Sequence, residues 1–188
     1  MLHLSNVSFV DSAARYLEVL ENSVPDYIYE GLFSIAVITL LLCLSIKGYK
    51  KGIGIACRIL LMMYVFLIYC STIIFRERLY KAKYSFSPFR SYCEYLNGKE
   101  NLLYENIMNV VVFVPIGMLA CIAYPWMKWW KIVLWSCGLS VSIELLQYIF
   151  HKGFSEVDDV IHNTLGCLVG VITYKGLQLL HKRYALWN

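Results

Sequence analysis

Long apolar runs dominate the sequence and predict a membrane protein with about five spanning helices. The runs occupy residues 27–46, 53–75, 107–125, 132–150 and 160–180. Each is at least 19 residues long. At about 1.5 Å of helix rise per residue, this length covers a hydrocarbon core of about 30 Å. The pattern therefore predicts an all-α, polytopic membrane helix bundle.

The first 26 residues follow a different pattern from the rest of the chain. Their apolar residues recur at spacings of three and four, which predicts an amphipathic helix that lies on the membrane or on the bundle. Four acidic residues against one arginine argue against attraction to anionic lipid and against a cleaved secretory leader. We expect an amphipathic N-terminal segment over 1–26 and a transmembrane domain over 27–188.

Composition supports the membrane interpretation and excludes two other classes of protein. The chain is 59% hydrophobic and 16% charged, whereas soluble domains have about 45–50% apolar and about 25% charged residues. Its formal charge of +4 is not gathered into a basic stripe, so we expect no nucleic-acid binding. No metal-ligand or cofactor motif is present, and we expect neither a metal nor a cofactor.

Cationic residues in the short connections predict the orientation of the bundle. Positive charges concentrate on the cytoplasmic side of membrane proteins. An outside N-terminus would place the following cations on that side: Lys47, Lys50, Lys51, Lys128, Lys131, Lys182 and Arg183. The longer segment 76–104 is also rich in cations and argues the other way, although its acidic residues offset them in part. We expect the N-terminus outside and the C-terminus in the cytoplasm. The tryptophans around 126–135 are typical of an interface anchor.

Polar residues gather at one end of the predicted bundle. Because successive spans alternate in direction, the start of the third span, the end of the fourth and the start of the fifth lie in one leaflet. The residues that meet there are Asn109, Glu144, Gln147, His162 and Asn163. The segments 76–104 and 151–159 emerge on the same side.

A polar stripe runs along the fourth span. Ser140, Glu144, Gln147 and His151 step by four, three and four residues and so share one helix face. A carboxylate below the membrane surface costs on the order of 2–3 kcal/mol to insert, so we expect Glu144 to have either a raised pKa or a cationic partner. The alternative is a neutral, hydrogen-bonded glutamate that joins two helices.

The fifth span combines acidic, amide and small residues. Gly166 and Gly170 form a GxxxG seam that we expect to admit another helix, with the fourth span as the favoured partner. Such packing would bring Asn163 near Glu144. Asp158 and Asp159 fit a helix cap or a site equally well. His162 lies one turn after Asp158, a spacing that suits an Asp–His general base or, with Glu144 and Asp159, a metal site. A hydrogen-bonded structural histidine is the commoner case.

The segment 76–104 interleaves cations with aromatic rings. Arg76 and Arg90 bound its most basic part, which also contains Arg78, Lys81 and Lys83. This pattern suits a phosphate-bearing headgroup at the membrane surface, because arginine binds phosphate in a bidentate manner. An ordinary interfacial loop would show a similar composition.

Three motifs in order resemble the VanZ-like membrane proteins. They are NVVVFVPIG at 109–117, SVSIELLQ at 140–147 and GFSEVDDVIHNTLGCLVG at 153–170. The resemblance covers roughly 85–172 and implies a multi-pass protein of the bacterial plasma membrane, associated with resistance to teicoplanin and related lipoglycopeptides. It maps the family's polar positions onto Asn109, Glu144, Gln147, Asp158, Asp159 and Asn163.

The chain departs from the family pattern at Lys152, where many members have arginine. Lysine keeps the positive charge there but not bidentate recognition of a carboxylate or phosphate. The leading hypothesis is a protein that binds a membrane lipid or lipid-linked cell-wall precursor. The alternative is an intramembrane enzyme acting on a lipid phosphate or ester, with Glu144 or Asp159 as general base and His162 assisting. A small transporter subunit is disfavoured because the spans show no internal repeat.

Overall fold

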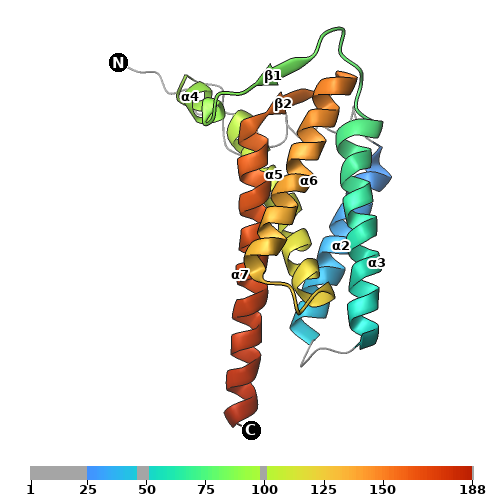
Figure 1. Cartoon of the computed structure of the whole chain (residues 1–188), viewed down its shortest axis with the longest axis vertical. Coiled ribbons are helices and arrows are strands. Elements are labelled where there is room, and N and C mark those ends of the chain that lie inside the picture. Colours follow the sequence, from blue (N-terminus) through green and yellow to red (C-terminus); the bar gives the residue numbers. More distant parts are fainter. Residues whose placement is uncertain (1–24, 46–50, 98–100, 188) are drawn as a thin grey trace.

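The computed structural model describes residues 25–45, 51–97 and 101–187. Five long helices within these ranges run roughly side by side (Figure 1). They are α2 (Asp26–Ser45), α3 (Lys51–Tyr69, continued by the short π-helix η1, Cys70–Ile74), α5 (Asn101–Ala123), α6 (Trp129–Phe150) and α7 (Val157–Trp187). All five predicted spans fall on these helices. The predicted amphipathic helix over 1–26 lies outside the described residues.

Three of the helices are long and apolar enough to cross a membrane. They are Lys51–Ile74, Leu102–Ala123 and Trp129–Phe150. Large apolar side chains cover much of the outer surface of the bundle, and Phe33 and Met62 are 71% and 64% exposed. A water-soluble protein would not leave so much apolar surface open, whereas lipid accommodates it. The chain is therefore a membrane protein, while α2 and α7 remain predicted spans.

The tightest helix packing joins α5 to α7 through glycine. A Cβ atom on Gly170 would lie 2.1 Å from the backbone oxygen of Val114, and one on Gly166 would lie 2.2 Å from that of Val110. Small residues permit this approach because nothing separates the two backbones. The GxxxG seam therefore packs against the third span, and the expectation that its partner is the fourth was wrong.

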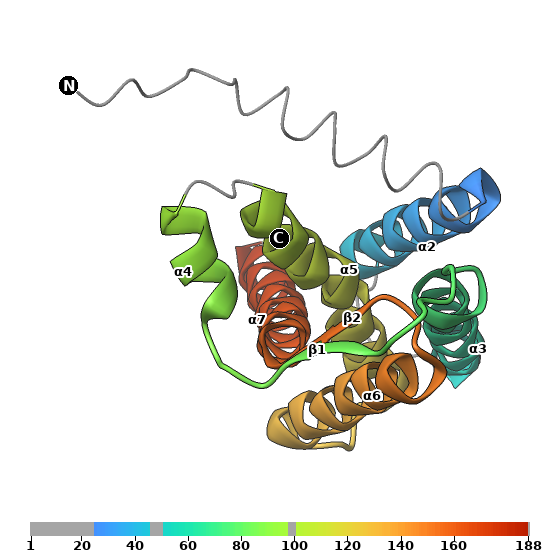
Figure 2. The same ribbon diagram turned by 90° about the horizontal axis from the view of Figure 1, so that it is seen from above.

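A small ribbon covers one end of the bundle and is absent from the all-α prediction. β1 (Lys83–Ser85) pairs in parallel with β2 (Phe154–Glu156), with Tyr84 opposite Ser155. After β1 the chain forms the short helix α4 (Arg90–Leu96) before it enters α5. Seen from above, β1 passes over the ends of α6 and α7 (Figure 2). Three-residue strands are too short for the alternation that identifies strands in a sequence.

Candidate functional site

The polar residues singled out in the sequence lie together beneath the ribbon. Asp158, Gln147, His162, Asn163 and Glu144 are all buried, with exposed fractions between 1% and 7%. They come from α6 and from the first two turns of α7, which meet at this end of the bundle (Figure 1). Buried polar side chains are costly unless they are hydrogen-bonded, so their partners show what the arrangement can do.

Glu144 ties α6 to the ribbon. Its Oε2 atom accepts a hydrogen bond of 2.8 Å from the backbone N–H of Glu156, the last residue of β2. The chain turns back to make this contact because His151 (φ 56°) and Gly153 (φ 77°) both adopt left-handed conformations after α6. Gly153 suits this position since glycine carries no Cβ penalty there. Glu144 thus holds the start of α7 against the end of α6.

Amide side chains connect α7 to its two neighbours. Asn109 Nδ2 on α5 donates to Asp159 Oδ1 at 2.8 Å, and Asn163 Nδ2 donates to Ser140 Oγ on α6 at 2.8 Å. Asn163 therefore reaches the stripe that contains Glu144, although the glycine seam that was expected to bring it there packs against α5. The residues come together as expected, but their part in ligand binding stays a prediction.

Asp158 caps a helix, although not its own. Its carboxylate accepts hydrogen bonds from the backbone N–H groups of Phe89 (2.5 Å) and Ser91 (2.9 Å) and from the Ser91 hydroxyl (2.6 Å). These residues begin α4, so Asp158 fixes the ribbon-to-α4 turn from across the structure. The two neighbouring aspartates have different environments: Asp158 caps α4, while Asp159 faces Asn109.

His162 is held by hydrogen bonds on both ring nitrogens. Nδ1 lies 2.6 Å from the backbone oxygen of Asp158, and Nε2 lies 2.7 Å from the hydroxyl of Tyr92. The Asp158 carboxylate binds Phe89 and Ser91 instead of the imidazole. These contacts make His162 a hydrogen-bonded part of the cluster, and its role as a general base stays a prediction.

Arg90 and Lys152 are also engaged within the protein. The Arg90 guanidinium bridges Glu94 at 2.7 Å and Glu156, and it lies 4.5 Å from the ring centre of Phe154. Lys152 donates through Nζ to the backbone oxygen of Arg76 at 2.5 Å. Both cations thus hold the ribbon in place, and their part in ligand binding stays a prediction.

The negative charges of this end influence one another. Burial, together with the carboxylates of Glu144 and Glu156, raises the pKa of Asp159 well above its ordinary value. Burial also raises the pKa of Glu156, against the opposing effect of Arg90. Burial alone would raise the pKa of Asp158, but the hydrogen bonds from Ser91 and Phe89 keep it below the usual range. Asp159 therefore takes up a proton more readily than Asp158 does.

Two buried amide oxygens in the cluster could each accept a hydrogen bond from a further donor. Gln147 Oε1 and Asn163 Oδ1 have no hydrogen-bond partner among the residues that the structure describes. Leaving such atoms unsatisfied costs about 1–3 kcal/mol each. They are places where a water or a donor group of a ligand would be stabilised.

Above the buried cluster lies an exposed surface that we call the basic ribbon, residues 78–86. Its exposed cations are Arg78, Lys81 and Lys83, and its exposed aromatic side chains are Tyr80, Tyr84 and Phe86. Within the described part of the chain, no ion pair joins these cations to a carboxylate. The sequence predicts two arginines as ligand-binding residues. Arg90 forms ion pairs with two carboxylates, and Arg76 lies half-buried beside Gly153.

Sequence reasoning missed two residues that organise this end, Glu156 and Ser91. Glu156 lies inside the GFSEVDDV motif and contacts both Glu144 and Arg90. Its position within that motif was the available signal. Ser91 gave no signal, because its partner Asp158 is 67 residues away in the chain.

Comparison with known proteins places this arrangement in a family. The VanZ/LLP1 family profile matches residues 55–181, which is well over half of the chain and includes both the buried cluster and the basic ribbon. A 77-residue stretch is 34% identical to "Protein VanZ" of Enterococcus faecium; it covers 41% of this chain and 47% of that protein, so the chain spans about half the length of this relative. No solved structure matches. The chain belongs to the VanZ/LLP1 family.

Proposed function

We propose that this protein is a multi-pass protein of the bacterial plasma membrane that binds an anionic lipid or lipid-linked cell-wall intermediate. In this proposal it contributes to resistance to teicoplanin and related lipoglycopeptides by changing their access to that intermediate. Family membership supports the general class, and the basic ribbon supports the charge of the ligand.

The observation that carries the proposal is the exposed charge of the basic ribbon. Arg78, Lys81 and Lys83 are solvent-accessible and stand beside exposed aromatic rings such as Tyr80, which is 95% exposed. Each cation near a membrane surface contributes about 1 kcal/mol to attraction of anionic lipid. The rings add amphipathic surface that settles at headgroup depth. Together they suit a phosphate-bearing group attached to a lipid.

The buried cluster supports this surface from beneath. Glu144 holds β2, Asp158 holds the turn into α4, and Lys152 holds the backbone at Arg76. These contacts fix both ends of the basic ribbon, so its cations are positioned before a ligand arrives. A surface ordered in advance loses less conformational entropy on binding. We propose that the family's polar positions act chiefly by supporting this surface, with Gln147 and Asn163 able to accept further hydrogen bonds.

The proposed orientation brings the basic ribbon to the outer face. With the N-terminus outside, the connections 76–104 and 151–159 face outward, and Lys128, Lys131, Lys182 and Arg183 face the cytoplasm. Lipid-linked precursors are used on the outer face, which is also where lipoglycopeptides arrive. The orientation and the ligand therefore agree.

The test is teicoplanin tolerance conferred on a sensitive host. A Lys81→Gln, Lys83→Gln variant removes two exposed charges without touching a described side-chain hydrogen bond, and we expect it to lose most of the tolerance. The control, Lys182→Gln with Arg183→Gln, removes two exposed charges from the other end and should retain tolerance. A ribbon variant that accumulates normally and protects fully would refute the proposal.

A further inference from the structure

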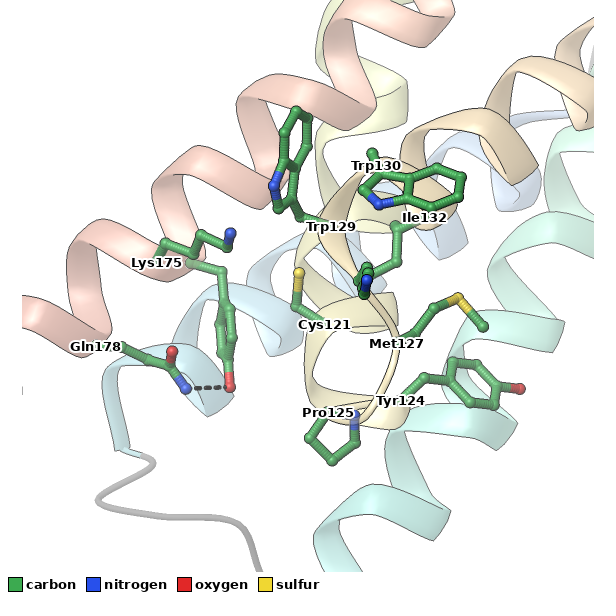
Figure 3. A pocket seen from close by; sticks show the side chains of 11 residues that line it. Cys121, Tyr124, Pro125, Met127, Trp129, Trp130, Ile132, Lys175 and Gln178 are labelled. Atoms are coloured by element: carbon green, nitrogen blue, oxygen red, sulfur yellow. Dashed lines mark hydrogen bonds between the residues drawn. The ribbon is translucent and has the colours of Figure 1, made fainter.

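A cavity lies at the end of the bundle opposite the basic ribbon. It has a volume of about 350 Å³ and opens between the α5–α6 connection and the middle of α7 (Figure 3). The residues that line it are Cys121, Tyr124, Pro125, Met127, Lys128, Trp129, Trp130, Ile132, Tyr174, Lys175 and Gln178. This volume is within the range of small-molecule sites, about 300–1,000 Å³. None of its residues takes part in the buried cluster described above.

The lining of the cavity is cationic and contains no acid. Lys128 and Lys175 both contribute to it, and its eleven residues include neither aspartate nor glutamate. The Lys175 ammonium lies 5.6 Å from the ring centre of Trp129. Within the described ranges, neither lysine forms an ion pair with a carboxylate. Both lysines are exposed, so their positive charge is available to an anion at the mouth of the cavity.

An uncharged amide and a hydroxyl group also line the cavity. Gln178 Nε2 donates to the Tyr174 hydroxyl at 2.7 Å, which fixes both side chains on the α7 side, as the dashed line in Figure 3 shows. Trp129 and Trp130 stand on the α6 side. Indole rings at a helix end favour the headgroup level of a bilayer. The cavity is thus placed where a lipid phosphate would be found.

An apolar groove adjoins the cavity and extends along the bundle. It has a volume of about 560 Å³ and shares Tyr124, Met127 and Ile132 with the cavity. Its other residues belong to α3, α5 and α6 and are mostly apolar: Leu61, Met62, Val65, Phe66, Tyr69, Ala120 and Trp135. A cationic cavity beside an apolar groove matches a molecule that has a phosphate at one end and a hydrocarbon chain at the other.

We propose that the cavity binds the phosphate of an anionic phospholipid, with one acyl chain in the adjoining groove. Lys128 and Lys175 neutralise the phosphate, while Tyr174 and Gln178 provide hydrogen bonds to the headgroup. The site is at the end assigned to the cytoplasm and uses none of the residues of the basic ribbon. This proposal therefore does not depend on the proposed function, and each can be refuted without the other.

The experiment is native mass spectrometry of the full-length protein in mild detergent, titrated with phosphatidylglycerol and with phosphatidylcholine of the same acyl composition. We expect tighter binding of phosphatidylglycerol to the wild type. Each lysine should contribute about fivefold to affinity, the equivalent of about 1 kcal/mol. The measurement is made in the Lys81→Gln, Lys83→Gln background, which removes two charges of the basic ribbon. In that background, Lys128→Gln with Lys175→Gln should weaken phosphatidylglycerol binding by about 25-fold and remove the preference over phosphatidylcholine, if the two effects are independent.

Two further variants separate this site from general surface charge. Lys182→Gln with Arg183→Gln removes two exposed cations further along α7, and neither residue lines the cavity, so affinity should stay within about twofold of the wild type. Lys128→Arg with Lys175→Arg keeps the charge and should retain the preference. Equal weakening by the control pair, or equal wild-type affinity for the two lipids, would overturn the proposal.

A titration with inorganic phosphate alone distinguishes the sources of the anion. The acyl groove predicts that phosphate binds far more weakly than phosphatidylglycerol. Phosphate that binds as tightly as the lipid would refute the phospholipid assignment, because the groove would then contribute nothing.

Discussion

Replacement of Gly170 by alanine should destabilise the protein by separating α5 from α7. The new Cβ would lie 2.1 Å from the Val114 oxygen and 3.1 Å from the Met118 nitrogen. A carbon–oxygen contact across helices needs about 3.3 Å, so the backbones must move apart by about 1 Å. Neither atom is the end of a flexible side chain, and the strain cannot be relieved by a rotamer change.

The magnitude follows from two opposing effects. Overpacking of a close interface costs about 1–3 kcal/mol, and a backbone contact this short places Gly170→Ala at the upper end of that range. Alanine in a helix gains about 0.5–1 kcal/mol over glycine. The net loss is then about 2 kcal/mol, which lowers Tm by about 4–8 °C for a chain of this size.

Gly176 provides the matched control for this prediction. It lies in the same helix, and nothing stands within 4 Å of the position that a Cβ atom would occupy there. Gly176→Ala should therefore raise stability by up to about 1 kcal/mol through helix propensity alone. Thermal unfolding in detergent, followed by circular dichroism, measures both variants. A Gly170→Ala protein at least as stable as Gly176→Ala would refute the close packing of α5 and α7.

The remaining predictions concern the buried cluster. Asp158→Ala should lower the free energy of unfolding by about 3 kcal/mol, because it removes an anionic acceptor of several hydrogen bonds. The folded-state pKa of Asp158 is lowered, so the carboxylate stabilises the protein at neutral pH. The difference in stability between wild type and variant should therefore become smaller as pH falls through that pKa. Asp159→Asn can keep the hydrogen bond from Asn109. The folded-state pKa of Asp159 is raised, so the wild type loses stability as pH rises from the ordinary pKa of an aspartate to that raised pKa. In a pH series of melting curves, Asp159→Asn should therefore gain stability relative to the wild type over this rise. His162→Gln should lower Tm yet leave teicoplanin tolerance unchanged, because both ring nitrogens already bond within the protein; loss of tolerance in a stable, well-accumulated variant would revive a catalytic role.

The sequence predicts the helices well because their signal is local and strong. A run of about 20 apolar residues is long enough to span a bilayer whatever surrounds it. Alternation of the spans then predicts which helix ends share a leaflet, and Asn163 and Ser140 do meet at that end of the bundle. Both inferences need only the order of apolar and polar residues.

The contacts of the cluster depend on information that periodicity does not carry. Gly166 and Gly170 predict a close helix partner, but the choice of α5 over α6 is decided by the whole packing arrangement. Asp158 has the position of a cap for its own helix, yet it binds Ser91 in a segment distant in the chain. Glu156 had a signal in its motif, but its contact with Arg90 requires the ribbon, which the sequence does not reveal.

The most direct test of the proposed ligand is mass spectrometry of lipids that co-purify with the protein. Wild type, the Lys81→Gln, Lys83→Gln variant and the Lys182→Gln, Arg183→Gln control would be extracted in parallel from the same bacterial host. We predict that an anionic lipid or lipid-linked precursor is enriched with the wild type and the control and depleted with the ribbon variant. Identical lipid profiles for all three proteins would contradict a ligand held by the basic ribbon.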